Sequence, residues 1–106
     1  MKTLKIISSR QYSDTGALDT SDTIYSGALA ASTEQTVTVP TGADFVRFEA
    51  TGDFYVNYDT TATVPSGTIS EAGGELNPDV RYIGETTTLH IISAGTPIVT
   101  LAFYSK

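Results

Sequence analysis

Few residues of this 106-residue chain have side chains suited to covalent or acid–base chemistry. There is no cysteine and only one histidine, His90, so thiol nucleophiles, disulfides and cysteine-ligated metal sites are excluded. A Ser–His–Asp triad would have to use His90. This residue alternates with Thr88 and Ile92 in a predicted strand, and no G-x-S-x-G elbow precedes a helix. We therefore expect His90 to be a structural or interface residue, and the chain to have no catalytic residue.

Carboxylates are the remaining chemical option. Asp14, Asp19 and Asp22 share one polar stretch, but their spacing departs from the calcium-loop pattern, so we expect a solvated loop. A pair such as Glu49 and Glu75 could hydrolyse a glycosidic bond only at a suitable separation in space. No phosphate- or dinucleotide-binding glycine motif occurs in the sequence. We expect no metal and no cofactor.

The charges are sparse and uneven. Twelve acidic and 6 basic residues give a net charge of −6, which leaves too few cations for a nucleic-acid interface. Lys2, Lys5 and Arg10 nevertheless lie in an opening segment without acidic residues, and Tyr12 follows them. We interpret residues 1–13 as a solvated first strand or as a basic arm that docks on an acidic surface, such as a second copy of this chain.

Neither a membrane span nor a signal peptide is predicted. No stretch approaches the roughly 18 apolar residues of a span. The apolar run near the start is shorter than the roughly 7–15 residues of a signal peptide and is interrupted by Lys5. We therefore expect residues 1–13 to belong to the mature fold and the chain to have no membrane partner.

The elements that position these residues are predicted to be β-strands. Serine and threonine together outnumber the charged residues, and threonine favours a pleated, half-buried surface over a helix. Turn signals about every ten residues predict a single all-β domain over residues 1–106, an antiparallel β-sandwich or jelly roll of about 7–8 short strands. The candidate strands are 3–8, 23–30, 35–39, 44–50, 53–59, 79–84, 87–93 and 97–104.

The alternation of apolar residues predicts two hairpins with three-residue loops. A loop at 51–53 would pair Phe48 with Val56, and a loop at 94–96 would pair Ile91 with Val99. The apolar faces of both hairpins would form most of the core, which is predicted to contain Val37, Val39, Val46, Phe48, Phe54, Val56, Leu89, Ile91, Val99, Leu101 and Phe103.

The other face of the second predicted hairpin is half apolar. It carries His90, Ile92, Ile98 and Tyr104, so we expect either segment 60–78 or a partner subunit to cover it. The predicted edge strands also lack the lysines that usually prevent a sheet edge from pairing with another chain, because residues 11–105 contain no lysine and few basic residues. Both features favour a chain that works in an assembly.

Several local strings resemble the small β-sandwich cement or decoration proteins of tailed bacteriophages. They are V-P-T-G-A-D-F-V-R-F at 39–48, A-T-G-D-F-Y-V at 50–56, E-L-N-P at 75–78 and L-A-F-Y at 101–104. The resemblance spans about residues 37–104. Its motifs mark turns and core strands and contain no reactive site.

The resemblance implies a non-enzymatic virion protein, made in the host cytoplasm, that sits on the outer capsid surface as a dimer or trimer. Its partner would be the major capsid protein, whose neighbouring subunits it would clamp together. Lys2, Lys5 and Arg10 become candidates for capsid contact. A second candidate is the loop that carries Glu75, Leu76, Asn77 and Pro78.

Two other functions stay open at this stage. A carbohydrate- or receptor-binding module of a phage fibre or tail would use a tyrosine platform, drawn from Tyr12, Tyr25, Tyr55, Tyr58, Tyr82 and Tyr104. A small glycan-acting enzyme would use carboxylates such as Glu49 and Glu75.

Overall fold

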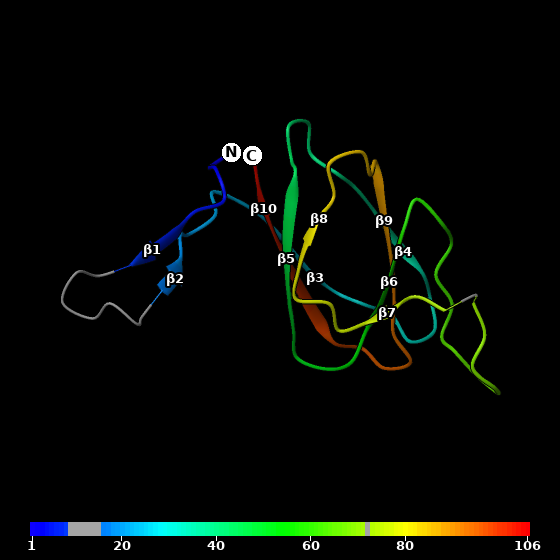
Figure 1. Cartoon of the computed structure of the whole chain (residues 1–106). Helices are drawn as coiled ribbons and strands as arrows, with labels where there is room; N and C mark the ends of the chain where they lie inside the picture. The colour runs from blue at the N-terminus through cyan, green and yellow to red at the C-terminus, as the bar shows by residue number, and fades with distance from the viewer. Residues whose placement is uncertain (9–15, 72) are drawn as a thin grey trace.

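Strands dominate the computed structural model, which describes residues 1–8, 16–71 and 73–106 (Figure 1). Every regular element within these residues is a β-strand, and none is a helix that could cross a membrane. The strands are β1 (Ile6–Ser8), β2 (Gly16–Leu18), β3 (Thr23–Ala28), β4 (Gln35–Thr38), β5 (Phe45–Ala50), β6 (Tyr55–Tyr58), β7 (Glu75–Leu76), β8 (Val80–Tyr82), β9 (Thr88–Ile92) and β10 (Ile98–Tyr104).

Strands β3 to β10 form two antiparallel four-stranded sheets. One sheet has the order β3-β10-β5-β8 and the other the order β4-β9-β6-β7. The pairings are nested along the chain, since β3 pairs with β10, β4 with β9, β5 with β8 and β6 with β7. Nested pairing in two sheets is the topology of a jelly roll. The predicted antiparallel sandwich is therefore confirmed.

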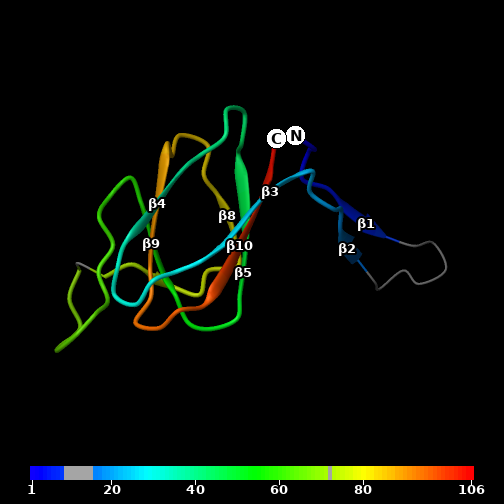
Figure 2. The same ribbon diagram turned by 180° about the vertical axis from the view of Figure 1, so that it is seen from behind.

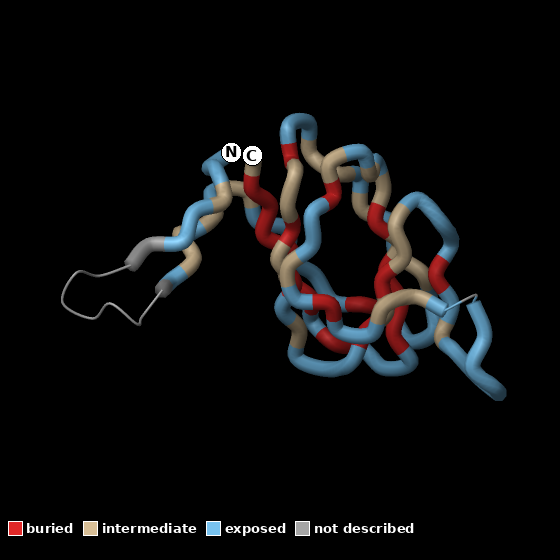
Figure 3. The backbone as a smooth tube through the Cα atoms, viewed as in Figure 1, coloured by how far each residue is buried: buried red, intermediate tan, exposed pale blue. Residues whose placement is uncertain are grey.

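The core lies between the two sheets (Figure 3). Its buried residues come from the inward faces of both sheets, as expected where two sheets pack face to face. All residues of the predicted core belong to it, with Val37 and Val39 partly buried at its margin. The structure adds Leu29, Ala43 and Ile83, which lie outside the strands.

The two predicted hairpins are wrong. β5 pairs with β10 and β8, whereas β6 pairs with β9 and β7, so residues 51–54 cross from one sheet to the other. Residues 93–97 cross in the same way between β9 and β10. Phe48 and Phe54 meet across the sandwich, with ring centroids 5.9 Å apart. β5 and β6 bury their side chains in the same core from opposite sheets, so their apolar and polar residues alternate just as they would in a hairpin.

The strand list also changes in detail. β2 and β7 lie in segments that we expected to be loops, and β7 is only 2 residues long. So short a strand leaves no alternation to detect. The first predicted strand, 3–8, lies outside the sandwich, because β1 pairs only with β2 among the described strands.

β1 and β2 form an arm that projects from the sandwich on the side of the β3-β10-β5-β8 sheet (Figures 1 and 2). We call the described residues 1–8 and 16–22 the arm. Both chain ends lie at its base, where Leu4 N donates to Ser105 O at 2.9 Å and Ser105 N donates to Lys2 O at 2.7 Å. The arm lengthens the molecule to 50 × 28 × 26 Å.

Candidate interaction surface

The basic opening segment meets acidic groups of its own arm. Lys2 Nζ donates to Thr20 Oγ1 at 2.9 Å and lies 4.0 Å from Asp19 Oδ1. The terminal amino group lies 3.7 Å from Asp22 Oδ2. Lys5 is exposed, and Arg10 and Tyr12 lie outside the described residues. The arm therefore offsets part of its own positive charge, which weakens the idea of a purely electrostatic dock.

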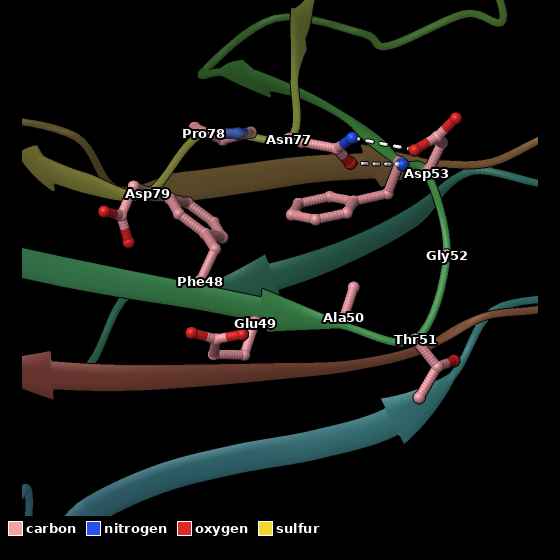
Figure 4. Close-up of a pocket in the computed structure, with 10 residues that line it drawn as sticks. Phe48, Glu49, Ala50, Thr51, Gly52, Asp53, Asn77, Pro78 and Asp79 are labelled. Atoms are coloured by element: carbon pink, nitrogen blue, oxygen red, sulfur yellow. Dashed lines mark hydrogen bonds between the residues drawn. The ribbon is translucent and has the colours of Figure 1, made fainter.

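The E-L-N-P string ties the two sheets together (Figure 4). Asn77 has a positive φ of 48°, and its side-chain oxygen accepts from Phe54 N at 3.0 Å. Asn77 Nδ2 donates to Asp53 Oδ1 at 2.8 Å. Two residues on, Asp79 O accepts from Phe48 N of β5 at 2.8 Å. Pro78 is buried and Leu76 is exposed, so the segment acts first as a structural brace.

The groove beside this brace has a volume of about 480 Å³. Phe48, Phe54, Glu49, Asp53 and Asp79 are among the residues that line it, and Glu49 directs its side chain to the side of β5 opposite Phe48 (Figure 4). Glu49 is paired with Arg47 at 2.8 Å, and Asp53 accepts from the brace. No group of three possible ligands that could hold a metal ion occurs within the described residues. The groove is a junction between sheets, and no reaction can be assigned to it.

Glu75 belongs to a second cluster, apart from Glu49. Arg81 Nε donates to Glu75 Oε2 at 2.9 Å, and Arg81 Nη2 lies 2.9 Å from the same oxygen. Tyr58 OH donates to the other oxygen at 2.6 Å. The hydrogen bonds from Arg81 lower the pKa of Glu75, while burial raises the pKa of Tyr58 above its ordinary value. Glu75 thus stays ionised and Tyr58 neutral, and the cluster links β6, β7 and β8.

On the outer face of the β4-β9-β6-β7 sheet, the chain covers itself. His90 Nδ1 lies 3.1 Å from Glu34 Oε1, and the other oxygen of Glu34 accepts from Ala62 N at 2.6 Å. The bond to His90 lowers the pKa of Glu34. Ala62 and Ile92 are both buried. Of the two covers that we expected for this face, segment 60–78 contributes through Ala62, and its residues 60–71 lie outside the sheet (Figures 1 and 2). A partner subunit on this face stays a prediction.

The outer face of the β3-β10-β5-β8 sheet is largely uncovered, and we call it the open face. Ile24, Ile98 and Tyr82 have exposed fractions of 56%, 51% and 61% on it. By strand register the face consists of Ile24, Ser26 and Ala28 from β3, Ile98, Thr100, Ala102 and Tyr104 from β10, Phe45, Arg47 and Glu49 from β5, and Val80 and Tyr82 from β8.

The arm closes one end of this face. Tyr104 is buried there, and its hydroxyl donates to Asp19 O at 2.7 Å. Ile98, near the other end of β10, stays exposed. The predicted hairpin would put Tyr104 and Ile98 on one face with His90 and Ile92, but in the structure these two pairs lie on opposite outer faces of the sandwich.

The open face includes Ile24 and Phe45, which the sequence alone did not single out, and Tyr82, which was a candidate only for a tyrosine platform. They share this face because β3 and β5 pair with β10 and β8 pairs with β5. The sequence did contain a signal for β3, since Ile24, Ser26 and Ala28 alternate with Tyr25 and Gly27. This alternation shows which residues share a side of the strand, but only the partner strand shows which side faces outward.

The described tyrosines do not form one stacking platform. Tyr25 and Tyr82 are the exposed ones, and they lie on β3 and β8, the opposite edges of one sheet. Tyr25 points toward the core side, where its ring meets Phe103 edge to face at 5.3 Å. Tyr82 packs on Phe45 with ring centroids 5.4 Å apart.

Searches of protein-family models, of curated proteins and of solved structures found no match for this chain. Its function is therefore inferred from the residues and their arrangement. We take the open face, which lies beside the arm, as the candidate interaction surface, because it exposes large apolar side chains.

Proposed function

We propose that the chain is a non-enzymatic structural virion protein of a tailed bacteriophage. In this proposal it binds the outer capsid surface through the open face and holds neighbouring major capsid subunits together. The observation that carries the proposal is the contrast between the two outer faces. On one face Ile92 is buried and Glu34 holds Ala62 of segment 60–71, whereas the other face leaves Ile24, Ile98 and Tyr82 exposed.

The chemistry of the open face suits a protein partner. Exposed apolar side chains supply the driving force for association. Between them lie short hydroxyl side chains, and Ser26 and Thr100 already bond to each other at 3.0 Å. Such side chains have few rotamers to lose on contact, so little entropy opposes binding.

The arm gives the proposed contact a second point of attachment. It projects beside the open face (Figure 1), and Ile6 at its start is exposed. If the sandwich binds one capsid subunit and the arm binds the next, the chain bridges the two subunits. Weak contacts of this kind become effective when symmetry repeats them over many copies of a shell.

The test uses capsid shells that lack the protein. Purified chain should bind them and raise their melting temperature. Ile98→Asp places a charge on the open face, and burying an unpaired carboxylate there should weaken binding by about tenfold or more. Ile69→Asp is the matched control, because Ile69 is fully exposed in segment 60–71 and the change in charge is identical.

The proposal expects the Ile69 variant to bind and stabilise shells like the unmodified chain. Absence of binding by the unmodified chain would overturn the proposal. Equal loss of binding in both variants would show that total charge, and not the open face, governs the contact. Retained binding in the Ile98 variant would remove the open face from the account.

A further inference from the structure

β3 is an exposed sheet edge that carries none of the usual protections against pairing. It reads T-I-Y-S-G-A, contains no charge and no proline, and is exposed at all but its first residue. The other edges of the two sheets are shorter than the 6 residues of β3, with 4 residues in β4, 3 in β8 and 2 in β7. Within these strands β8 carries Arg81 and β7 carries Glu75, which hinder pairing, while β4 is uncharged but short.

The backbone of β3 offers its free groups in a regular row. Leu29 N donates to Pro97 O at 2.9 Å, so the odd-numbered residues of the strand direct their backbone groups toward β10. The even-numbered residues Ile24, Ser26 and Ala28 therefore direct their N–H and C=O groups away from the sheet. Among the described strands β3 is the last of its sheet (Figure 2), and within that part of the chain these groups face another strand only if a second molecule supplies it.

We propose that β3 pairs antiparallel with β3 of a second copy of this chain, in a register centred on Ser26. The two β3-β10-β5-β8 sheets would then join into one continuous sheet across a twofold axis. Ser26 would face Ser26 of the second copy, and Ile24 would face Ala28. A shift by two residues in either direction would place strand residues opposite turn residues and shorten the pairing.

The side chains of β3 complement each other in this register. Ile24 meets the small Ala28, and Tyr25 meets Gly27 on the other side of the strand. A Cβ at Gly27 would contact nothing within 4 Å, so the exposed Tyr25 ring of the second copy has room to lie there. A tyrosine over a glycine across an edge is a known stabilising pair in sheets.

A groove next to β3 provides the rest of the contact. It lies between β3 and β4 and has a volume of about 340 Å³. Its lining is mainly apolar and includes Leu29, Val37, Ile91, Val99 and Leu101, together with Tyr25 and Gly27. Since Gly27 lies at the groove, Tyr25 of the second copy would cover its mouth.

The uncharged, self-complementary sequence of β3 favours a second copy as the occupant. Each copy has a net charge of −6, and because β3 itself carries no charge, pairing along it places no like charges face to face. A specific interface needs roughly 1,000 Å² in total, or about 500 Å² from each copy, so the proposed contact has to bury the groove mouth as well as the strand edge. We expect a dimer with a micromolar dissociation constant. The pairing is independent of any capsid role.

A single cysteine tests the register directly, because the chain has no cysteine of its own. In Ser26→Cys the two thiols would sit on Cα atoms about 5.5 Å apart, within the range that a disulfide spans. Mild oxidation should convert this variant to a covalent dimer. Thr36→Cys, exposed on edge strand β4, is the matched control and should stay largely monomeric.

Sedimentation of the cysteine-free chain tests the pairing itself. The unmodified chain should form a dimer at tens of micromolar. Gly27→Val should weaken the dimer by about tenfold, since its side chain has open space in the monomer but occupies the site of the second Tyr25. Ile24→Lys, which places a charge on the edge, should do the same, and circular dichroism confirms that both variants are folded.

Three results would overturn the proposal. One is equal cross-linking of the two cysteine variants. Another is an unmodified chain that stays monomeric at several hundred micromolar. The third is a dimer that neither edge variant weakens, which would place the contact on another surface.

Discussion

Replacing Asn77 by alanine should destabilise the fold, because this residue is a brace before it is any kind of contact residue. Its side-chain oxygen accepts from Phe54 N at 3.0 Å, and its amide nitrogen donates to Asp53 at 2.8 Å. Its backbone also has φ of 48°, a left-handed conformation that asparagine tolerates better than alanine.

The expected loss follows from these contacts. Leaving the Phe54 N–H without its acceptor costs about 1–3 kcal/mol, because Phe54 is buried. The left-handed backbone adds about 1 kcal/mol in alanine. We expect Asn77→Ala to lower the free energy of unfolding by about 2–4 kcal/mol and the melting temperature by roughly 10–20 °C. Asn77→Gly lacks the same side chain but tolerates this φ, so it should be about 1 kcal/mol more stable than the alanine variant.

Urea unfolding at neutral pH, followed by circular dichroism, measures these differences. Asn57→Ala is the control, because Asn57 has a negative φ and donates only to Thr61 O in a loop, at 3.0 Å. It should cost less than about 1 kcal/mol. If Asn77→Ala and Asn77→Gly both unfold within about 0.5 kcal/mol of the unmodified chain, the brace is refuted. The string would then be free to act as a contact loop.

Two further predictions concern single carboxylates. The pKa of Glu75 is lowered, so its ionised form stabilises the fold above the ordinary value of 4.5, and this contribution disappears as the pH falls through the lowered pKa. Glu75→Gln should therefore be less stable at pH 7 and lose less stability on acidification, as urea unfolding at several pH values can check. Glu34→Ala removes the acceptor of the buried Ala62 N–H, so segment 60–71 should be cleaved faster by thermolysin. Unchanged cleavage would show that His90 and Glu34 do not hold that segment.

The inward and outward sides of the strands can be predicted from the sequence because burial imposes a period of two on each strand. This is why Val46, Phe48 and Val56 were assigned correctly to the core. The same period cannot say which strand lies beside which. β5 and β6 bury the same side whether they pair in one sheet or face each other across the core, so the choice depends on long-range partners.

The covered and open outer faces illustrate the same limit. Ile92 and Ile98 look alike in the sequence, each on the outward side of a strand, yet Ile92 is buried and Ile98 is half exposed. Only the sheet of Ile92 has segment 60–71 on its outer side, where Glu34 accepts from Ala62 N, 28 residues away in the chain. No local pattern records that distant contact, so the open face emerges only from the fold.

A cryo-EM map of the virion to which the proposal assigns this chain tests the central claim most directly. The account predicts density for the jelly roll on the outside of the shell, with Ile98, Tyr82 and Arg47 of the open face toward the capsid and segment 60–71 toward solvent. A shell without this density, or a jelly roll that meets the capsid through segment 60–71, would contradict it.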